Sequence, residues 1–293
     1  MTPELQQQLS TAPSAQIERL AYLEARLYFL GVLQRNDLMQ RFAVATVQAS
    51  RDVALYRQLA ADNLYYDASA KRYFPSDNFK RLFSFPVRDV LLWLTSGRGD
   101  GLKHASGLAV DAVPAPGLPA APQLATITRA IYRGKALSLN YLSLTHGAQR
   151  REIVPHALAD SGLRWHVRAF DRQNQRFADF VINRMSELSV LDGAIASEQT
   201  AKYDGQWQEM VTLELIPHPR LAQQAAILAD YAMEDGHLCL SSRQALAGYL
   251  LRRWNVDATQ DHSLNDGAIQ LALANPQVLE GIESAVLAPG RSA

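Results

Sequence analysis

The sequence has one cysteine, Cys239, in its 293 residues. A single cysteine cannot close an internal disulfide or seed a cysteine-rich zinc site, and its neighbours Leu238 and Leu240 predict a structural role in a buried strand. The chain also lacks any run of about 18 apolar residues, and residues 1–14 lack the basic start and apolar centre of a secretory signal. We therefore expect a cytoplasmic protein that does not bind a membrane.

The motifs of common catalytic and cofactor sites are also missing. The chain contains no phosphate loop ending in Gly-Lys-Ser/Thr, no His-Glu-x-x-His and no Gly-x-Ser-x-Gly. The glycine-rich run at 97–101 lacks the spacing of a dinucleotide fingerprint and is typical of a linker. The seven histidines show no close pairing of the kind that binds metals. These absences argue against an enzyme, a cofactor and a metal site, and we assign no catalytic residue.

The chain lacks a net charge, because 29 basic residues balance 29 acidic ones. The balance is uneven along the chain. Residues 1–85 carry ten basic and eight acidic side chains, residues 124–192 carry ten and six, and residues 193–293 carry six and twelve. An anionic partner therefore fits the first and middle parts, whereas the acidic last part argues against nucleic acid there.

Length and composition favour an α+β protein of several domains. A chain of 293 residues exceeds the usual size of one core, and 48% hydrophobic residues can fill two or three. Residues 96–123 are rich in glycine, proline and alanine and predict the main linker. We place a first domain at 1–95, a middle domain at 124–192 and a last domain at 193–293.

The first domain shows the order of a winged helix. Helical spacing of leucines predicts a helix at 17–30 that ends at Gly31. A short helical segment follows, with Asn36 and Asp37 as cap candidates, and then a further helical stretch at 46–59. Two aromatic-rich strands at 64–66 and 72–74 then predict a hairpin. Three helices followed by a hairpin are typical of a winged helix-turn-helix.

A helix-turn-helix buries one side of its second helix and presents the other to the DNA major groove. Ala49, Val53 and Tyr56 have the spacing of the buried side. The candidate DNA contacts are the outward side chains near the start of this helix and those of the hairpin: Thr46, Gln48, Ser50, Arg51, Lys71, Arg72 and Tyr73. Arginine can pair with guanine and glutamine with adenine, while serine or threonine can reach phosphate. The alternative is a solvated helix and surface hairpin, since an excess of two positive charges is small for a DNA-binding domain.

The middle domain changes from helical spacing to alternation. After a short helix predicted at 124–132, short strands separated by tight turns predict a small, strongly bent sheet or barrel. His166 and Arg168 lie on one face of their strand, opposite Trp165, and arginines near a histidine suit an anion. Such a histidine is expected to stay neutral near pH 7. The alternative is that the aromatic residues are core and the arginines form a solvated face.

The last domain mixes strands and helices. A strand at 211–216, a helix at 220–231, a strand at 238–240 and a helix at 244–253 predict a compact α+β unit. Its apolar residues can all be explained as internal core.

The motifs of all three parts resemble one family. Residues 37–83, with Gln48-Ala49-Ser50-Arg51-Asp52 and Lys71-Arg72-Tyr73, resemble the winged helix-turn-helix of the WYL-domain regulators, in particular repressors associated with BREX and CBASS phage-defence operons. The middle part, with Leu137-Ser138-Leu139-Asn140-Tyr141 and Trp165-His166-Val167-Arg168-Ala169, is similar to a WYL domain. The last part, with Leu215-Ile216-Pro217-His218-Pro219, resembles the C-terminal extension of the same repressors.

This resemblance implies a central WYL Sm-like small β-barrel and a C-terminal α+β dimerisation domain. It also implies a ligand pocket at the positions matching Tyr141, Arg151, His156, Trp165, His166, Arg168 and Arg184. The chain departs from the name-giving tripeptide, with His166 and Val167 in place of tyrosine and leucine. The implied ligand is a small anion of the nucleotide or oligonucleotide class.

The sequence therefore predicts a homodimeric transcriptional regulator that binds a palindromic double-stranded DNA operator. A dimer is expected also because one recognition helix reads too few bases for specificity. Repression of a phage-defence operon follows from the resemblance only. The alternatives are an activator of the same family, a protein that binds or processes oligonucleotides, and a binding module whose winged helix contacts protein.

Overall fold

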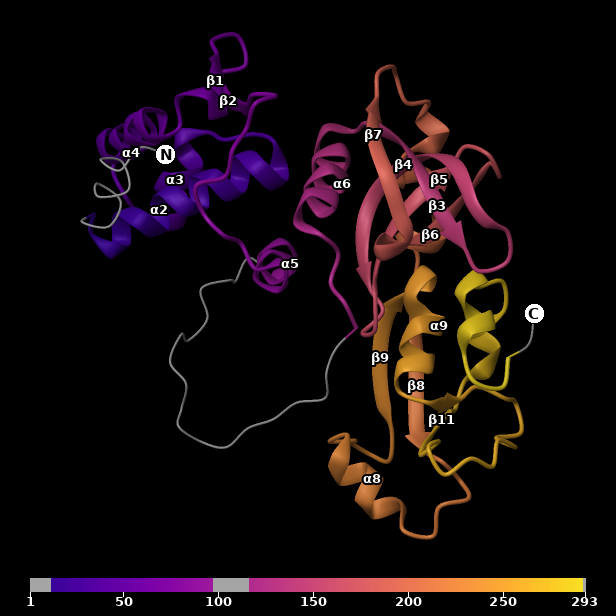
Figure 1. Ribbon diagram of the computed structural model, residues 1–293. Helices are drawn as coiled ribbons and strands as arrows, with labels where there is room; N and C mark the ends of the chain where they lie inside the picture. Colours follow the sequence, from indigo (N-terminus) through magenta and orange to yellow (C-terminus); the bar gives the residue numbers. More distant parts are fainter. Residues whose placement is uncertain (1–11, 97–115, 292–293) are drawn as a thin grey trace. The chain divides into compact units, whose positions relative to one another are not determined.

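The computed structural model describes residues 12–96 and 116–291, which form two compact units (Figure 1). The first unit contains the winged-helix part together with residues 117–140 and 186–192. The second contains residues 141–185 and 193–291. The predicted linker lies mostly at 97–115, outside the described residues.

Three helical segments begin the first unit. Helix α2 (Ser14–Ala25) continues into the π-helical turn η1 (Arg26–Leu30), which ends at Gly31 with a φ of 72°. A left-handed backbone of this kind favours glycine, so the predicted end of the helix is confirmed. Helices α3 (Arg35–Phe42) and α4 (Thr46–Leu59) follow and form the helix-turn-helix pair.

The buried side of α4 is the one predicted from spacing. Ala49, Val53 and Tyr56 are at most 2% exposed and belong to an apolar core shared with α2 and α3. Packing of this side against the other two helices supplies most of the stability of α4, since a single helix of this length is marginal in water. The opposite side of α4 is therefore directed away from the core.

The predicted hairpin is also present. Strands β1 (Leu64–Asp67) and β2 (Arg72–Pro75) pair in antiparallel register, and Leu33 forms an isolated bridge with Tyr73. The Asp67 carboxylate accepts hydrogen bonds from the backbone of Ser69 and of the next residue, which closes the turn. Helix α5 (Val87–Ser96) then follows. The winged helix-turn-helix expected from the sequence is thus confirmed.

A buried polar cluster ties the helices of this domain to the segment after the wing. The Glu24 carboxylate is fully buried and accepts hydrogen bonds from Tyr56 Oη at 2.7 Å and from the backbone N–H groups of residues 82–83. Asn63 Nδ2 donates to Tyr56 Oη at 2.9 Å. Burial raises the pKa of Glu24, and the backbone and tyrosine hydrogen bonds act in the opposite direction. The Tyr56 hydroxyl is the link between the acid and the amide.

Helix α6 (Ala121–Arg133) packs on η1 in the same unit. Thr128 Oγ1 donates to the Phe29 carbonyl at 2.5 Å, and Arg133 Nη2 donates to the Gly31 carbonyl at 2.8 Å. Carbonyl groups at the end of a helical segment lack partners within it, so both bonds satisfy orphan acceptors. The winged helix and the first helix of the middle domain are thereby joined.

The middle domain is a five-stranded sheet in the order β6-β5-β4-β3-β7. Its last strand returns beside its first, as in Sm-like barrels. A register shift between Pro155 and Ala157 bends the long strand β4 at His156. The strands are β3 (Ala136–Ser143), β4 (Gly147–Asp160), β5 (Trp165–Asp171), β6 (Arg176–Val181) and β7 (Met185–Leu191).

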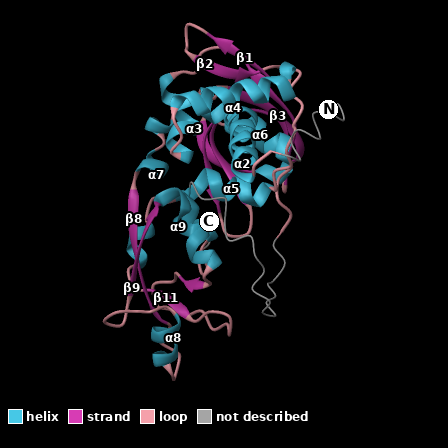
Figure 2. Ribbon diagram, turned by 90° about the vertical axis from the view of Figure 1, so that its left-hand side faces the viewer, coloured by secondary structure: helices cyan, strands magenta, loops and turns pink. Residues whose placement is uncertain are grey.

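The last domain is an α+β unit built on a four-stranded sheet in the order β10-β11-β8-β9, seen from the side in Figure 2. Helix α9 packs against the short helical segment η7 (Glu283–Leu287) so closely that a Cβ on Gly248 would lie 1.7 Å from the Ser284 carbonyl oxygen. The remaining elements are α7 (Gly205–Gln208), β8 (Met210–Pro217), α8 (Gln224–Asp230), β9 (Leu238–Arg243), α9 (Gln244–Arg253), β10 (Val256–Asp257) and β11 (Leu271–Leu273).

The prediction that Cys239 is buried is wrong. The strand around it is present, but Cys239 is exposed and lies opposite Glu214 in the register. Strand β9 is an edge strand with one covered face, so successive side chains alternate between core and solvent and the cysteine falls on the solvent side. The two leucines beside it are the ones that pack against the core.

None of the described helices is long and apolar enough to cross a membrane. Within residues 12–96 and 116–291, no three His, Cys, Asp or Glu side chains gather into a group that could hold a metal ion.

Replacing Tyr56 by phenylalanine is expected to lower the free energy of unfolding by about 1–3 kcal/mol, because Glu24 and Asn63 each lose a buried hydrogen-bond partner. Urea denaturation followed by circular dichroism measures this loss. Tyr65→Phe is the matched control, since Tyr65 is 55% exposed. Equal stability of the two variants would contradict the structural role of the cluster.

Candidate nucleic-acid interface and ligand site

The start of α4 and the wing place four of the seven predicted DNA contacts in solvent. Thr46 and Arg51 are exposed on α4, and Lys71 and Arg72 are exposed at the turn of the hairpin. Lys71 adopts a left-handed backbone with a φ of 52°, as required at the tight turn. These side chains lie outside the core and can reach a nucleic acid, although Thr46 Oγ1 also donates to Met39 Sδ at 3.5 Å.

The other three candidates are held by the protein. Gln48 Nε2 donates to Asp52 at 3.0 Å, and the same carboxylate binds Arg19 of α2 at 2.6 Å. Tyr73 is half-buried and packs against the core of the domain. The bond from Gln48 lies within α4 and orients the Asp52 carboxylate, which in turn joins α4 to α2 through Arg19.

Ser50, the third candidate that is held by the protein, is bonded to Arg35, a basic residue that was not among the predicted DNA contacts. Ser50 Oγ accepts a hydrogen bond from Arg35 Nη1 at 3.4 Å, which brings the exposed start of α3 beside the exposed side of α4. The signal was available in the sequence, since Arg35 is the first residue of the first helix of the pair.

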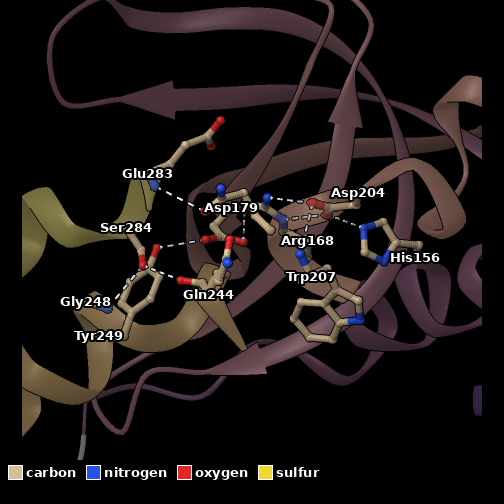
Figure 3. A network of polar contacts seen from close by, with 11 residues as sticks. His156, Arg168, Asp179, Asp204, Trp207, Gln244, Gly248, Tyr249, Glu283 and Ser284 are labelled. Carbon is tan, nitrogen blue, oxygen red and sulfur yellow. Dashed lines mark hydrogen bonds and ion pairs between the residues drawn. The ribbon is translucent and has the colours of Figure 1, made fainter. Parts of the chain in front are cut away.

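Arg168 occupies the centre of the predicted ligand site, but it is already paired. Its guanidinium is 4% exposed and binds the Asp204 carboxylate in a bidentate fashion, with Nε–Oδ2 at 2.8 Å and Nη2–Oδ1 at 2.9 Å (Figure 3). Asp179, which pairs with Arg168 across strands β5 and β6, lies 3.5 Å from Nη1. Two carboxylates therefore flank the one guanidinium.

His156 joins the same network. Its Nε2 lies 2.9 Å from Asp204 Oδ2, and its ring meets the Trp207 indole edge to face at 5.7 Å. Burial raises the pKa of Asp204, but the hydrogen bonds from His156 and Arg168 outweigh it and bring the pKa to about 2. Asp204 is therefore ionised at neutral pH. The two side chains that bind it, His156 and Arg168, are ones that the family resemblance assigns to the ligand pocket.

Helix α9 covers the neighbouring part of this face. Tyr249 Oη donates to Asp179 Oδ2 at 3.2 Å, and the Tyr249 ring lies 5.1 Å from the His166 ring. Burial raises the pKa of Asp179, and the charge of Arg168 opposes this rise. The predicted common face of His166 and Arg168 is therefore present, but the C-terminal domain packs on it.

His166 is 6% exposed. Burial lowers its pKa to about 4, and the charges of Arg164 and Arg184 act in the same direction. The expectation of a neutral histidine near pH 7 agrees with this shift. Arg164, one strand position before Trp165, was not among the sequence candidates.

The remaining candidates are distributed around the sheet. Arg151 Nη1 binds Asp171 at 3.1 Å, so it is engaged at the far end of β5. Tyr141 Oη accepts the Val181 N–H at 3.2 Å. Trp165 is half-buried at the start of β5. Val181 is the register partner of His166, so Tyr141 lies beside His166, whereas Arg151 is held at the opposite end of β5.

A polar pocket of about 360 Å³ lies beside Arg168 in the second unit. It combines two arginines with three acidic side chains and aromatic walls. Its lining is Arg168, Phe170, Gln175, Arg176, Phe177, Tyr203, Asp204, Gly205, Gln206, Glu209, Gln244 and Glu283. Seven of these residues follow position 200, far along the chain from the WYL motif, and no local pattern marks them.

The stability of the protein is expected to fall as the pH drops from 6.5 to about 4. In this range His166 becomes protonated in the unfolded chain but stays neutral in the folded one. The free energy of unfolding therefore falls by at most about 3 kcal/mol. Urea titrations at several pH values measure the slope.

His166→Gln should flatten this dependence, and the exposed His237→Gln should not. Identical slopes for His166→Gln and the wild type would show that His166 titrates normally.

Three family models match the chain. Residues 15–96 match the winged helix-turn-helix domain of the BrxR transcriptional regulator, residues 122–190 match the WYL domain, and residues 210–279 match the C-terminal dimerization domain of BrxR. The three matches lie in the order predicted from the sequence.

Curated relatives extend over most of the chain. A DNA-binding transcriptional repressor CapW of Stenotrophomonas maltophilia is 34% identical over 83% of this chain and 84% of its own. CapW proteins of Escherichia coli (strain KTE188) and Pseudomonas aeruginosa are 32% and 34% identical, each over 89% of both chains. All three are named as regulators and not as enzymes, in agreement with the sequence analysis. The chain therefore belongs to the BrxR and CapW family of transcriptional regulators, built from a winged helix-turn-helix, a WYL domain and a C-terminal dimerization domain.

Proposed function

We propose that this protein is a homodimeric transcriptional repressor that binds a palindromic double-stranded DNA operator in the cytoplasm. The WYL domain controls DNA binding by taking up a small anion of the nucleotide or oligonucleotide class. The regulated genes are those of a phage-defence operon, as the family resemblance implies.

The exposed cationic start of α4 is the observation that carries DNA binding. Arg51 projects from a helix whose opposite side is fixed in the core by Ala49 and Val53, which is the arrangement of a recognition helix. The wing adds Lys71 and Arg72, which suit the phosphate backbone. The names of the CapW relatives support the same function.

The match of residues 210–279 to a dimerization domain supports the homodimer. A closed two-fold dimer presents two recognition helices related by symmetry, and its operator then has two inverted half-sites. The acidic balance of residues 193–293 fits contact with protein better than contact with DNA.

The pocket beside Arg168 supports a ligand. It holds two guanidinium groups and three aromatic rings, a combination that suits a phosphate joined to a planar base. Control of DNA binding requires that this ligand bind one conformation of the dimer better than the other.

A mobility-shift titration tests the proposed function. The full-length protein is titrated on the DNA upstream of its own gene and on a scrambled sequence, at two salt concentrations. We expect a preference for the upstream DNA and a steep loss of affinity with salt. Equal affinity for both DNAs would favour a protein that binds or processes oligonucleotides, and no binding to either would favour a protein partner.

Arg51→Ala is expected to weaken binding to the preferred DNA by about 1–3 kcal/mol, because the guanidinium is directed to a base edge. Arg57→Ala is the matched control, since Arg57 is exposed in the last turn of the same helix. The same titration compares the two variants. An equal loss in both would mean that Arg51 supplies charge and no sequence recognition.

A further inference from the structure

The contacts of Asp204 are those of a bound anion. Its carboxylate accepts two hydrogen bonds from Arg168, lies 2.9 Å from His156 Nε2 and accepts the Trp207 N–H at 3.2 Å. A guanidinium fork, an imidazole and a backbone amide are the groups with which proteins bind carboxylates and phosphates. Asp204 is 1% exposed and follows the WYL sheet in the chain by more than ten residues.

The charge of this cluster leaves no room for a second anion. Asp204 and Asp179 carry two negative charges against the one positive charge of Arg168. Both carboxylates also line or adjoin a buried site, where like charges repel strongly. A phosphate that approached Arg168 from the pocket would therefore add a negative charge to a cluster that already has an excess of one.

Of the two carboxylates, only that of Asp204 lies on a backbone segment that can move away from Arg168. Asp179 belongs to strand β6, directly opposite Arg168 in the register, and is held by the hydroxyl of Tyr249. Asp204 instead precedes the four-residue helix α7, in a segment without strand pairing, and it lines the pocket that would admit the ligand.

We propose that Asp204 fills an anion subsite formed by Arg168 and His156 when the ligand is absent, and that a phosphate group entering the adjoining pocket takes its place. This rests on the proposed function, since it assumes that the WYL domain binds an anion. Arg176 is exposed on the same pocket and supplies a second cation for the incoming group. Glu209 and Glu283 on the pocket wall favour a ligand with one phosphate over a polyanion.

Helix α7 connects Asp204 to the C-terminal domain, so displacement of the Asp204 side chain affects that domain. Gln206 of this helix donates to the Gly281 carbonyl at 3.1 Å and accepts the Glu283 N–H at 3.1 Å. The Trp207 indole contacts the His156 ring and also the Arg243 guanidinium, which is 4.7 Å from the indole. Release of Asp204 removes the side-chain cap of α7 and so loosens the segment that joins the WYL sheet to the family's dimerization domain.

Isothermal titration calorimetry with inorganic phosphate, on the full chain without DNA, tests the exchange. Asp204→Asn keeps the size of the side chain and removes its charge, so the subsite is easier to vacate. We expect this variant to bind phosphate at least tenfold more tightly than the wild type. Asp230→Asn is the matched control, because it removes one exposed carboxylate from the same unit, and it should bind like the wild type.

Hydrogen exchange of the wild-type protein provides a second readout that needs no variant. The backbone N–H of Trp207 bonds to the Asp204 carboxylate, and that of Gln208 bonds to the Asp204 backbone carbonyl in the turn that this carboxylate caps. We expect Trp207 to exchange faster when phosphate is present, and Gln208 as well if the turn loosens. If Asp204→Asn fails to fold, this measurement decides.

Equal phosphate affinity in Asp204→Asn and the wild type, with α7 unchanged in exchange, would overturn the proposal. Failure of both proteins to bind phosphate would overturn it as well. Neither result would affect operator binding, which the mobility shift measures separately, whereas a protein that exchanges Asp204 for phosphate but ignores its upstream DNA would overturn the proposed function only.

Discussion

The buried ion pair between Arg168 and Asp204 determines how the middle and last domains meet. A guanidinium that is 4% exposed requires a partner, since leaving one member of a buried pair alone costs about 3–5 kcal/mol. The partner comes from the segment after the WYL sheet, so this segment must return to the face of β5 that carries Arg168. Tyr249 and Trp207 then pack on the same face, beside Asp179 and His156. The C-terminal domain is thus seated on the surface that family resemblance assigns to a ligand.

The DNA-binding part depends on a different set of buried polar contacts. Glu24, Tyr56 and Asn63 connect the recognition helix to α2 and to the segment after the wing, and Asp52 connects it again through Arg19. Because the inner side of α4 is held at several points, its outer side has a defined direction. A recognition helix needs this rigidity to place a side chain against a base edge.

Local patterns in the sequence were sufficient for the helices, the hairpin and the inner side of α4. Spacing identifies Ala49, Val53 and Tyr56 because helical periodicity is a property of neighbouring residues. The partner of Arg168 could not be found in this way, since Asp204 lies 36 positions away and no motif surrounds it. The exposure of Cys239 was missed for a related reason: flanking leucines indicate a strand, but only the packing of the sheet shows that one of its faces is left in solvent. Long-range pairing also separates Arg151 from the rest of the predicted ligand set, because Asp171 holds it at the far end of β5, whereas Tyr141 lies beside His166.

The proposed operator contacts lie at the start of α4 and in the wing. Hydrogen–deuterium exchange of the full chain with and without its upstream DNA tests this proposal most directly. We expect added protection at the first turns of α4 and at residues 67–73 of the hairpin, with no added protection of the β8–β9 sheet. Protection of the WYL sheet or of the C-terminal domain by DNA, with α4 and the wing unchanged, would show that the operator binds elsewhere on the protein.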